Sequence, residues 1–283
     1  MKRTQSAQKK FTGKTVMVTG ASSGIGLEIS RRFAALGAKI ILVGRDEKKL
    51  LRAARTLNST SAFPYRCDVR DVSALRKLVQ DVTKKHGDID ILINNAGFNK
   101  RGAFLSVDLA SLESILQTNL VAPIVLSRLC AEHMPRGGAV INIASIAGMV
   151  PVYHEAAYSA SKAGLRAFGR VIAEELAPRG IRVKNINPGP VDTGFLGHEV
   201  ESVPDLVFSQ PMSSAAAVAE LVVQAIPTQA VELAIPRSSA LLATLAYVFP
   251  AFLRITRPVL EKIGRYRKQR YLLQRRTGKR VTS

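Results

Sequence analysis

The sequence predicts an α/β protein built on one doubly wound domain, with a parallel sheet of about seven strands and helices on both faces. Short runs rich in Val, Ile and Leu alternate with amphipathic stretches from Lys14 to about Pro236. Each apolar run ends in a turn and is followed by a helical pattern, the arrangement of right-handed βαβ units. No internal repeat or low-complexity linker divides this region, so the 283 residues predict one large domain followed by a C-terminal extension.

Hydrophobic spacing assigns the elements in chain order. The first strand is expected at Lys14–Thr19, and the first helix at Ile25–Leu36, ending at Gly37. Asp46 is placed to cap the second helix. The other strands are expected at 39–43, in a segment ending near Cys67, and at 89–93, 139–143, 181–186 and 231–235; the other helices are expected at 47–57, 72–86, about 109–130, 158–177 and 215–226.

Positive charge is concentrated at the two ends of the chain. Residues 1–10 hold four Lys or Arg and no acid, and residues 254–283 hold eleven Lys or Arg and one acid. The two ends therefore carry most of the net charge of +20. The main domain is therefore only mildly basic. We expect a basic disordered N-terminus at 1–10, the dinucleotide-binding and catalytic domain at 11–236, and an apolar then basic helical tail at 237–283.

Composition and targeting signals exclude several classes of protein. The hydrophobic share of 47% and the charged share of 22% are ordinary for a chain with a real core, which argues against disorder as the main state. Two cysteines, Cys67 and Cys130, are too few for a disulfide framework or a four-cysteine zinc site, and are expected to be buried reduced thiols. The four histidines lack metal-ligand spacing, so no metal site is predicted. With no secretory signal and no window of ~18–20 uncharged apolar residues, a cytoplasmic protein is expected.

A glycine-rich turn joins the first strand to the first helix. Its glycines follow the pattern Gly-x-x-x-Gly-x-Gly, at positions where side chains would block the turn, the approach of a pyrophosphate or the packing of helix on strand. The helix N-terminus behind the turn offers free N–H groups and the positive end of its dipole to phosphates. The sequence therefore predicts a dinucleotide site at the loop residues Gly20, Ser22, Ser23, Gly24, Ile25 and Gly26.

The segment Thr19–Gly26 resembles the cofactor motif of the short-chain dehydrogenases/reductases, and the family's other motifs follow in order. Asn94-Asn95-Ala96-Gly97 follows the fourth strand, Tyr158-x-x-x-Lys162 opens a long helix, and Asn187–Thr193 matches the loop that cradles the nicotinamide. The resemblance covers about residues 11–236 and implies a Rossmann domain with a nicotinamide cofactor; we also expect a homodimer or homotetramer. The resemblance also implies which further residues contact the cofactor: Asp68, Val69, Asn95, Ala96, Gly97, Tyr158, Lys162, Pro188, Gly189, Val191 and Thr193.

The end of the second strand favours NADP(H) over NAD(H). A carboxylate there would accept a hydrogen bond from a ribose 2′-hydroxyl and repel a 2′-phosphate. Gly44 occupies that place, and Arg45 follows it with a guanidinium that can pair with phosphate. Many NADP-using relatives carry a second base just before the middle glycine of the loop, where this chain has Ser23.

Tyr158 and Lys162 stand four residues apart, and thus on one face of a helix. A free phenol titrates near ~10, and an adjacent ammonium should lower that pKa toward the range useful for proton transfer. Ser145 closes the preceding strand, at the edge of the sheet where ligands bind. By the resemblance, Tyr158 exchanges the proton, Ser145 binds the carbonyl oxygen, Lys162 holds the nicotinamide ribose, and Asn119 supports a proton path through water.

The tail carries a wide apolar face followed by cations. Leu241, Leu245, Val248 and Phe252 recur at helical spacing, and Ile255, Val259, Leu260 and Ile263 extend the apolar side. Such a face followed by cations suits an interfacial helix on an anionic membrane. Packing on the protein itself or on a sister subunit remains open. Nucleic acid is the least favoured partner, because the tail carries no nucleic-acid motif.

The leading hypothesis is an NADP(H)-dependent oxidoreductase that transfers hydride between the nicotinamide and a carbonyl or alcohol of a hydrophobic, lipid-like substrate. Specificity is expected from the loops at 98–101, 149–154 and 195–212, which mix apolar side chains with little acid. The alternatives are a catalytically idle scaffold of the same fold, or a binding protein tethered to membrane or nucleic acid. The membrane alternative places the protein at the periphery of the cytoplasmic face.

Overall fold

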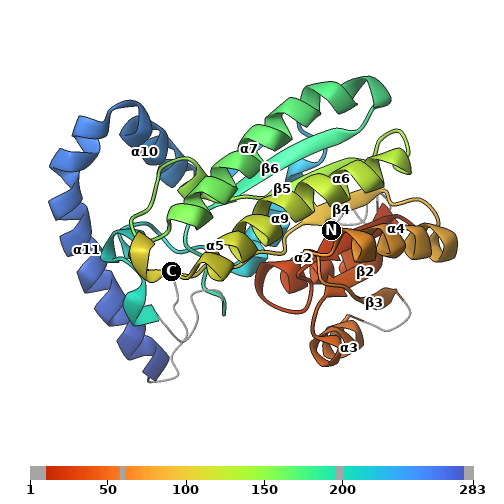
Figure 1. Cartoon of the computed structure of the whole chain (residues 1–283), viewed down its shortest axis with the longest axis horizontal. Helices are drawn as coiled ribbons and strands as arrows, with labels where there is room; N and C mark the ends of the chain where they lie inside the picture. The colour runs from red at the N-terminus through yellow and green to blue at the C-terminus, as the bar shows by residue number, and fades with distance from the viewer. Residues whose placement is uncertain (1–10, 58–60, 195–199, 277–283) are drawn as a thin grey trace, which may run out of the picture.

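Seven parallel strands form the centre of the domain in the computed structural model, which describes residues 11–57, 61–194 and 200–276 (Figure 1). Their order across the sheet is β3-β2-β1-β4-β5-β6-β7. The chain therefore winds outward in one direction from β1 to β3, and in the other direction from β4 to β7. Such a switch between β1 and β4 leaves a crevice at the carboxyl ends of the strands, where doubly wound domains bind ligands. The strands are β1 (Thr15–Thr19), β2 (Lys39–Gly44), β3 (Ala62–Arg66), β4 (Ile91–Asn94), β5 (Ala139–Ile143), β6 (Arg182–Pro188) and β7 (Glu232–Ile235).

Helices cover both faces of the sheet because the central strands bury side chains on both sides. In β1, Val16 and Val18 belong to one core while Met17 belongs to the other. The doubly wound architecture predicted from the sequence is thereby confirmed. The first core packs under α2 (Gly24–Ala35), α3 (Glu47–Thr56) and α9 (Ala215–Ala225); the second packs under α4 (Val72–His86), α6 (Ala122–Glu132) and α7 (Ala156–Leu176) (Figure 1).

Within the domain, the predicted strands and helices agree with the observed ones to within two residues, with one exception. The long helix expected at 109–130 is divided into α5 (Leu109–Leu116) and α6 by a π-helical turn, Gln117–Val121. A turn of this kind inserts an extra residue into the helix and is frequent at functional sites. Asp46 caps α3 as predicted, because its carboxylate accepts a hydrogen bond from the Lys49 backbone N–H at 3.0 Å.

The tail forms two helices, α10 (Arg237–Val248) and α11 (Pro250–Arg276). The chain bends at Phe249, and Pro250 cannot donate the hydrogen bond that would continue α10. The single apolar row expected from Leu241 to Phe252 is therefore shared between two helices. Figure 1 shows both helices at one end of the molecule, opposite α3 and α4. The basic segment expected at 1–10 and the last seven residues of the tail lie outside the described residues.

One described helical segment, Leu109–Glu132, is by length and composition apolar enough to cross a membrane, which the sequence did not lead us to expect. Its side chains of Ala122, Leu126 and Cys130 lie in the core beneath the sheet. A third of its most apolar window is buried, and Leu109 and Leu116 at its start are exposed. Both cysteines, Cys67 and Cys130, are free and buried as predicted, and burial raises the pKa of each thiol.

Candidate functional site

The glycine-rich loop has the backbone that its sequence requires. Gly20 and Gly24 have positive φ values of 64° and 55°, which side chains rarely adopt. Gly26 is needed for close packing, since a Cβ there would lie 2.4 Å from the carbonyl oxygen of Gly20. Helix α2 begins at Gly24, and the residues at its start, Ser23, Gly24 and Ile25, line the cavity. The loop therefore fits a pyrophosphate held by backbone N–H groups.

A polar network fastens this loop to the end of β4. The Thr19 hydroxyl accepts hydrogen bonds from the backbone N–H groups of Asn95 and Ala96, at 3.0 and 2.9 Å. In return, the Asn95 side-chain amide donates to the Thr19 carbonyl at 2.8 Å and to the Gly20 carbonyl at 3.3 Å. The side chain of Asn95 thus shapes the phosphate loop.

The three residues expected to carry the chemistry converge on one cavity. Ser145 follows β5, which ends at Ile143, and its hydroxyl caps a short 3₁₀ turn by accepting from the Ala147 N–H at 3.1 Å. Tyr158 and Lys162 lie on the first turns of α7 and are 8% and 4% exposed. The Lys162 Nζ donates to the Ile143 carbonyl at 2.8 Å and lies 5.7 Å from the centre of the Tyr158 ring. Ser145 and Tyr158 share a hydrogen bond.

The proton affinities in the cavity differ from the sequence-based expectation. Burial raises the pKa of Tyr158 to about 12, although the hydrogen bond with Ser145 acts in the opposite direction. Burial also lowers the pKa of Lys162 to about 8. The lowering of the tyrosine pKa by Lys162 expected above is therefore not found in the free protein, because loss of water outweighs the neighbouring groups. Tyr158 is protonated at neutral pH, the form in which a phenol can donate a proton.

These values predict the pH dependence of carbonyl reduction. Tyr158 keeps its proton through the neutral and mildly alkaline range, whereas Lys162 loses its charge as the pH rises through about 8. Because a charged lysine favours negative charge developing on the nearby phenol oxygen, we expect kcat/KM for reduction to fall above about pH 8. A pH–rate profile of the free enzyme with a soluble ketone measures this. A plateau that extends to about pH 10 would contradict the assignment.

Asn119 lies on the π-helical turn, and its side chain is held in place mainly by hydrogen bonds to the backbone of Phe98. Its side-chain oxygen accepts from the Phe98 N–H, and its amide donates to the Phe98 carbonyl, both at 3.0 Å. The amide also donates to the Ser161 hydroxyl at 3.2 Å, and the residue is fully buried. A Cβ added at Gly97 would lie 3.1 Å from the Asn119 oxygen and 3.5 Å from the Lys162 Nζ. The side chain of Asn119 therefore lies next to Gly97, on the side of this glycine that also faces Lys162.

The opposite end of the cavity carries two cations. Arg45 follows β2 and is exposed, and its positive charge is one of the smaller causes that lower the pKa of Asp68 across the cavity end. Lys49, on the first turn of α3, lines the same part of the cavity. The Asp46 carboxylate is engaged by the Lys49 N–H, with the Lys49 Nζ at 3.7 Å. Lys49 was missed by the sequence analysis, although its spacing of four residues from Arg45 is a readable signal.

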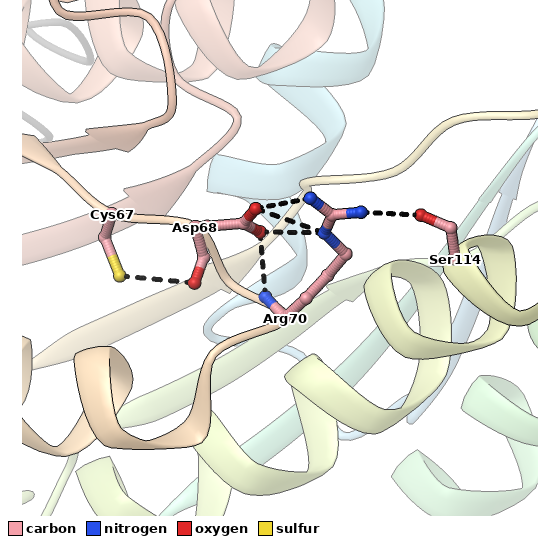
Figure 2. Close-up of polar contacts among 4 residues, drawn as sticks. All are labelled: Cys67, Asp68, Arg70 and Ser114. Atoms are coloured by element: carbon pink, nitrogen blue, oxygen red, sulfur yellow. Dashed lines mark hydrogen bonds and ion pairs between the residues drawn. The ribbon is translucent and has the colours of Figure 1, made fainter. Parts of the chain in front are cut away.

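Figure 2 shows how the loop after β3 is held. The Arg70 guanidinium donates to both oxygens of Asp68, the shortest contact being 2.6 Å, and the Arg70 N–H donates to the same carboxylate at 3.0 Å. Arg70 also donates to the hydroxyl of Ser114 on α5 at 2.9 Å. These contacts keep the pKa of Asp68 below its usual value. Asp68 is thereby fixed as an anion at the rim of the cavity.

The loop after β6 closes the other side. Gly189 donates its N–H to the Ile235 carbonyl at 2.8 Å, and Val191 forms a bridge with Ser213. The side chain of Thr193 lies against the phosphate loop, since a Cβ on Gly24 would be 3.6 Å from it. Asp192, between them, accepts a 2.6 Å hydrogen bond from the hydroxyl of Tyr271 on α11. The tail is thus tied to the loop expected to hold the nicotinamide.

A buried ion pair stands beside the catalytic group. The Arg101 Nε donates to Glu155 at 2.7 Å, and the two side chains are 9% and 6% exposed. Burial raises the pKa of Glu155, and the Arg101 guanidinium opposes this shift. Both residues line the cavity, and the Gly102 N–H donates to the His154 carbonyl nearby. The pair fastens the loop after β4 to the start of α7.

The phosphate loop, the catalytic group and the two cations border one cavity of about 560 Å³, a size typical of ligand sites. Every residue expected to contact cofactor or substrate lines it except Gly26 and Asn119, which stand just behind its wall. Residues 195–199 of the third expected specificity loop lie outside the described residues. In that part of the chain which the structure describes, no group of three His, Cys, Asp or Glu side chains could hold a metal. Arg101 belongs to the specificity loop expected at 98–101 and does line the cavity, whereas the wall residues that sequence reasoning missed include Lys49, Glu155, Leu242, Ala243, Ala246, Thr256 and Leu260.

Comparisons with known proteins agree with this geometry. Residues 14–203 match the family model described as short chain dehydrogenase. The ketoacyl reductase HetN of Nostoc sp. is 39% identical over 230 residues, which are 78% of this chain and 78% of that protein. A short chain dehydrogenase from Burkholderia cenocepacia, solved in complex with NADP, shares 30% identity with a TM-score of 0.73, covering 80% of this chain and 97% of its own. BdcA in complex with NADPH shares 31% identity with a TM-score of 0.70, covering 80% and 93%.

Proposed function

Because this chain belongs to the short-chain dehydrogenase family of oxidoreductases, we propose that it is an NADP(H)-dependent enzyme that reduces the carbonyl of a hydrophobic, lipid-like substrate, or oxidises the corresponding alcohol. The observation that carries the proposal is the convergence of Ser145, Tyr158 and Lys162 on a cavity with a cationic end and an apolar end. The ketoacyl reductase among its relatives supports carbonyl reduction as the direction.

The chain's own residues supply binding and proton transfer. The nicotinamide cofactor, when bound, supplies or accepts the hydride. Ser145 donates a hydrogen bond to the substrate oxygen, where charge develops in the transition state. Tyr158, protonated at neutral pH, gives its proton to that oxygen in reduction and removes it in oxidation. Lys162 places a positive charge beside the phenol and would hold the ribose of a bound cofactor.

The cationic end supports NADP(H) in preference to NAD(H). Arg45 and Lys49 border the region next to Gly44, and Asp46 is committed to capping α3. Lys49 therefore supplies the second base that is lacking at Ser23 in the phosphate loop. A 2′-phosphate at this end would meet two cations, whereas a 2′-hydroxyl would find no free carboxylate from Asp46. The two neighbouring complexes with NADP and NADPH add to this support.

We expect Arg45→Asp to lower the preference for NADPH over NADH by about 10–100-fold, because a charge-assisted pair worth ~1.5–3 kcal/mol is replaced by repulsion. The measurement is kcat/KM for both cofactors at low concentration. Lys48→Asp, which makes the same change of charge at an exposed neighbour that does not line the cavity, is the matched control. An unchanged preference in Arg45→Asp would show that this guanidinium does not contact the cofactor.

The apolar end supports a hydrophobic substrate. It is lined by Leu206 and Val207 of α8 (Asp205–Phe208), by Leu242 of α10 and by Leu260 of α11. Ketones and alcohols of graded chain length, assayed with NADPH and NADH, test the proposal as a whole. We expect kcat/KM to rise with chain length, since each buried CH₂ is worth ~0.8 kcal/mol. No turnover on any member would favour the catalytically idle scaffold, for which the intact catalytic group has no chemical use.

We also propose a homodimer or homotetramer, located in the cytoplasm or on the cytoplasmic face of a membrane. Leu109 and Leu116 of α5 and Val171 of α7 are exposed apolar side chains that suit contact with a sister subunit. Sedimentation of the purified protein measures the subunit number. The proposed membrane contact is made by the tail, residues 237–283.

A further inference from the structure

Helix α11 is held on the domain by polar contacts of one face. Arg265 and Lys268 each approach the Asp205 carboxylate at 3.3 Å, and Lys268 also donates to the Val203 carbonyl at 2.6 Å. Gly264 permits the close approach, because a Cβ there would lie 1.8 Å from the Asp205 carbonyl oxygen. Lys268 is therefore turned toward its own domain, and Arg265 reaches the same carboxylate from a more exposed position.

The opposite face of α11 presents apolar side chains to solvent. Its exposed apolar residues recur at spacings of four, four, three and seven, which places them along one side of a helix. A helix on a water-soluble domain ordinarily shows the reverse pattern, with its apolar stripe inward. We call this set the outer stripe; it consists of Ile255 (77% exposed), Val259 (61%), Ile263 (40%), Tyr266 (62%) and Leu273 (61%).

The neighbouring helix adds a second exposed apolar row. Leu241, Leu245 and Val248 of α10 are exposed and follow helical spacing, and exposed Phe249 joins α10 to α11. The outer stripe runs along one side of α11, and the row on α10 with Phe249 adds four exposed apolar side chains to the tail. Surfaces of that kind mark contacts with a partner or a membrane.

Unpaired cations accompany the outer stripe. Lys262 and Arg270 fall on the same side of the helix as Ile255 and Tyr266, by their spacing. No carboxylate of the described residues pairs with either of them, and the one acid of α11, Glu261, is taken by Arg257 at 2.7 Å. A second copy of the chain meeting this stripe through a two-fold axis would set these cations against one another. An anionic surface complements them.

We propose that the outer stripe of α11 docks on an anionic lipid bilayer, with the apolar side chains between the lipids and Lys262 and Arg270 at the level of the headgroups. The inner side of the same helix contributes Thr256 and Leu260 to the cavity wall, and α10 contributes Leu242. Docking would therefore bring the apolar end of the cavity close to the bilayer. The docking itself does not depend on the proposed function; only the use of the cavity for a lipid-like substrate rests on it.

The test uses the full-length protein, without cofactor or substrate, in flotation with two kinds of vesicle. One kind is phosphatidylcholine alone; in the other, about a third of the lipid is phosphatidylserine. We expect binding to the anionic vesicles that weakens as salt shortens the Debye length toward ~3 Å near 1 M. Lys262→Glu/Arg270→Glu should weaken binding at low salt by about thirty-fold or more, while Lys77→Glu/Lys84→Glu on exposed positions of α4 should change it little.

A second variant separates lipid contact from contact between copies. Ile255→Ser/Val259→Ser changes only exposed side chains, so the fold should persist, and vesicle binding should fall at least tenfold with an unchanged subunit number. Equal binding to both kinds of vesicle, or none to either, would overturn the proposal. So would a change of subunit number in this variant, because a second copy would then be the partner of the stripe. Turnover of a soluble ketone, measured separately, reports on the proposed function alone.

Discussion

Replacing Tyr158 by phenylalanine should lower kcat for carbonyl reduction by about 10²–10⁴-fold, the usual worth of general acid–base catalysis. The substitution keeps the ring, which is buried against Lys162, and removes only the hydroxyl that shares a hydrogen bond with Ser145. Cofactor affinity should change much less, since the phosphate loop and the cationic end do not depend on this hydroxyl. Steady-state kinetics and cofactor titration by fluorescence measure the two effects.

The matched control is Tyr247→Phe, which removes the same hydroxyl from an exposed tyrosine on α10. It should leave turnover of a soluble ketone unchanged. If Tyr158→Phe keeps near-normal turnover, another group must donate the proton, and the assignment of the catalytic group would be wrong. A loss shared equally by cofactor binding and turnover would instead indicate damage to the site.

Gly264→Val should separate α11 from the domain. A Cβ at this position would lie 1.8 Å from the Asp205 carbonyl oxygen and 2.6 Å from its carbonyl carbon, and this backbone cannot move aside like a flexible side chain. Overpacking costs about 1–3 kcal/mol or more, so we expect the melting temperature to fall by roughly 2–12 °C. Turnover of long-chain substrates should fall with it, because α11 supplies part of the cavity wall and its Tyr271 holds Asp192.

Gln269→Val is the control, because it introduces the same side chain at an exposed position of the same helix. Differential scanning calorimetry measures the melting temperature of the two variants, and limited proteolysis measures how readily the tail is cleaved in each. A melting temperature of Gly264→Val equal to that of the control would show that α11 does not pack on α8 in solution.

The architecture was readable from the sequence because each layer leaves a local pattern. A parallel strand buried on both faces is a short continuous apolar run, as at residues 15–19, and the glycines after it stand where backbone geometry admits no side chain. Ser145, Tyr158 and Lys162 could be named for the same reason: their chemistry depends on residue type, and Tyr158 and Lys162 lie within one helix. Lys49 was also within reach, one helical turn after Arg45.

Other properties depend on where water is excluded and on which distant segments meet, and no local pattern encodes them. The sequence suggested that Lys162 lowers the pKa of Tyr158, yet burial in the folded cavity raises it to about 12. The amphipathic tail was recognisable from residue spacing, but spacing fixes only which residues share a face. Only the packing of Gly264 on Asp205 and of Tyr271 on Asp192 decided which face turns inward, leaving Leu260 in the cavity wall and Ile255 in solvent.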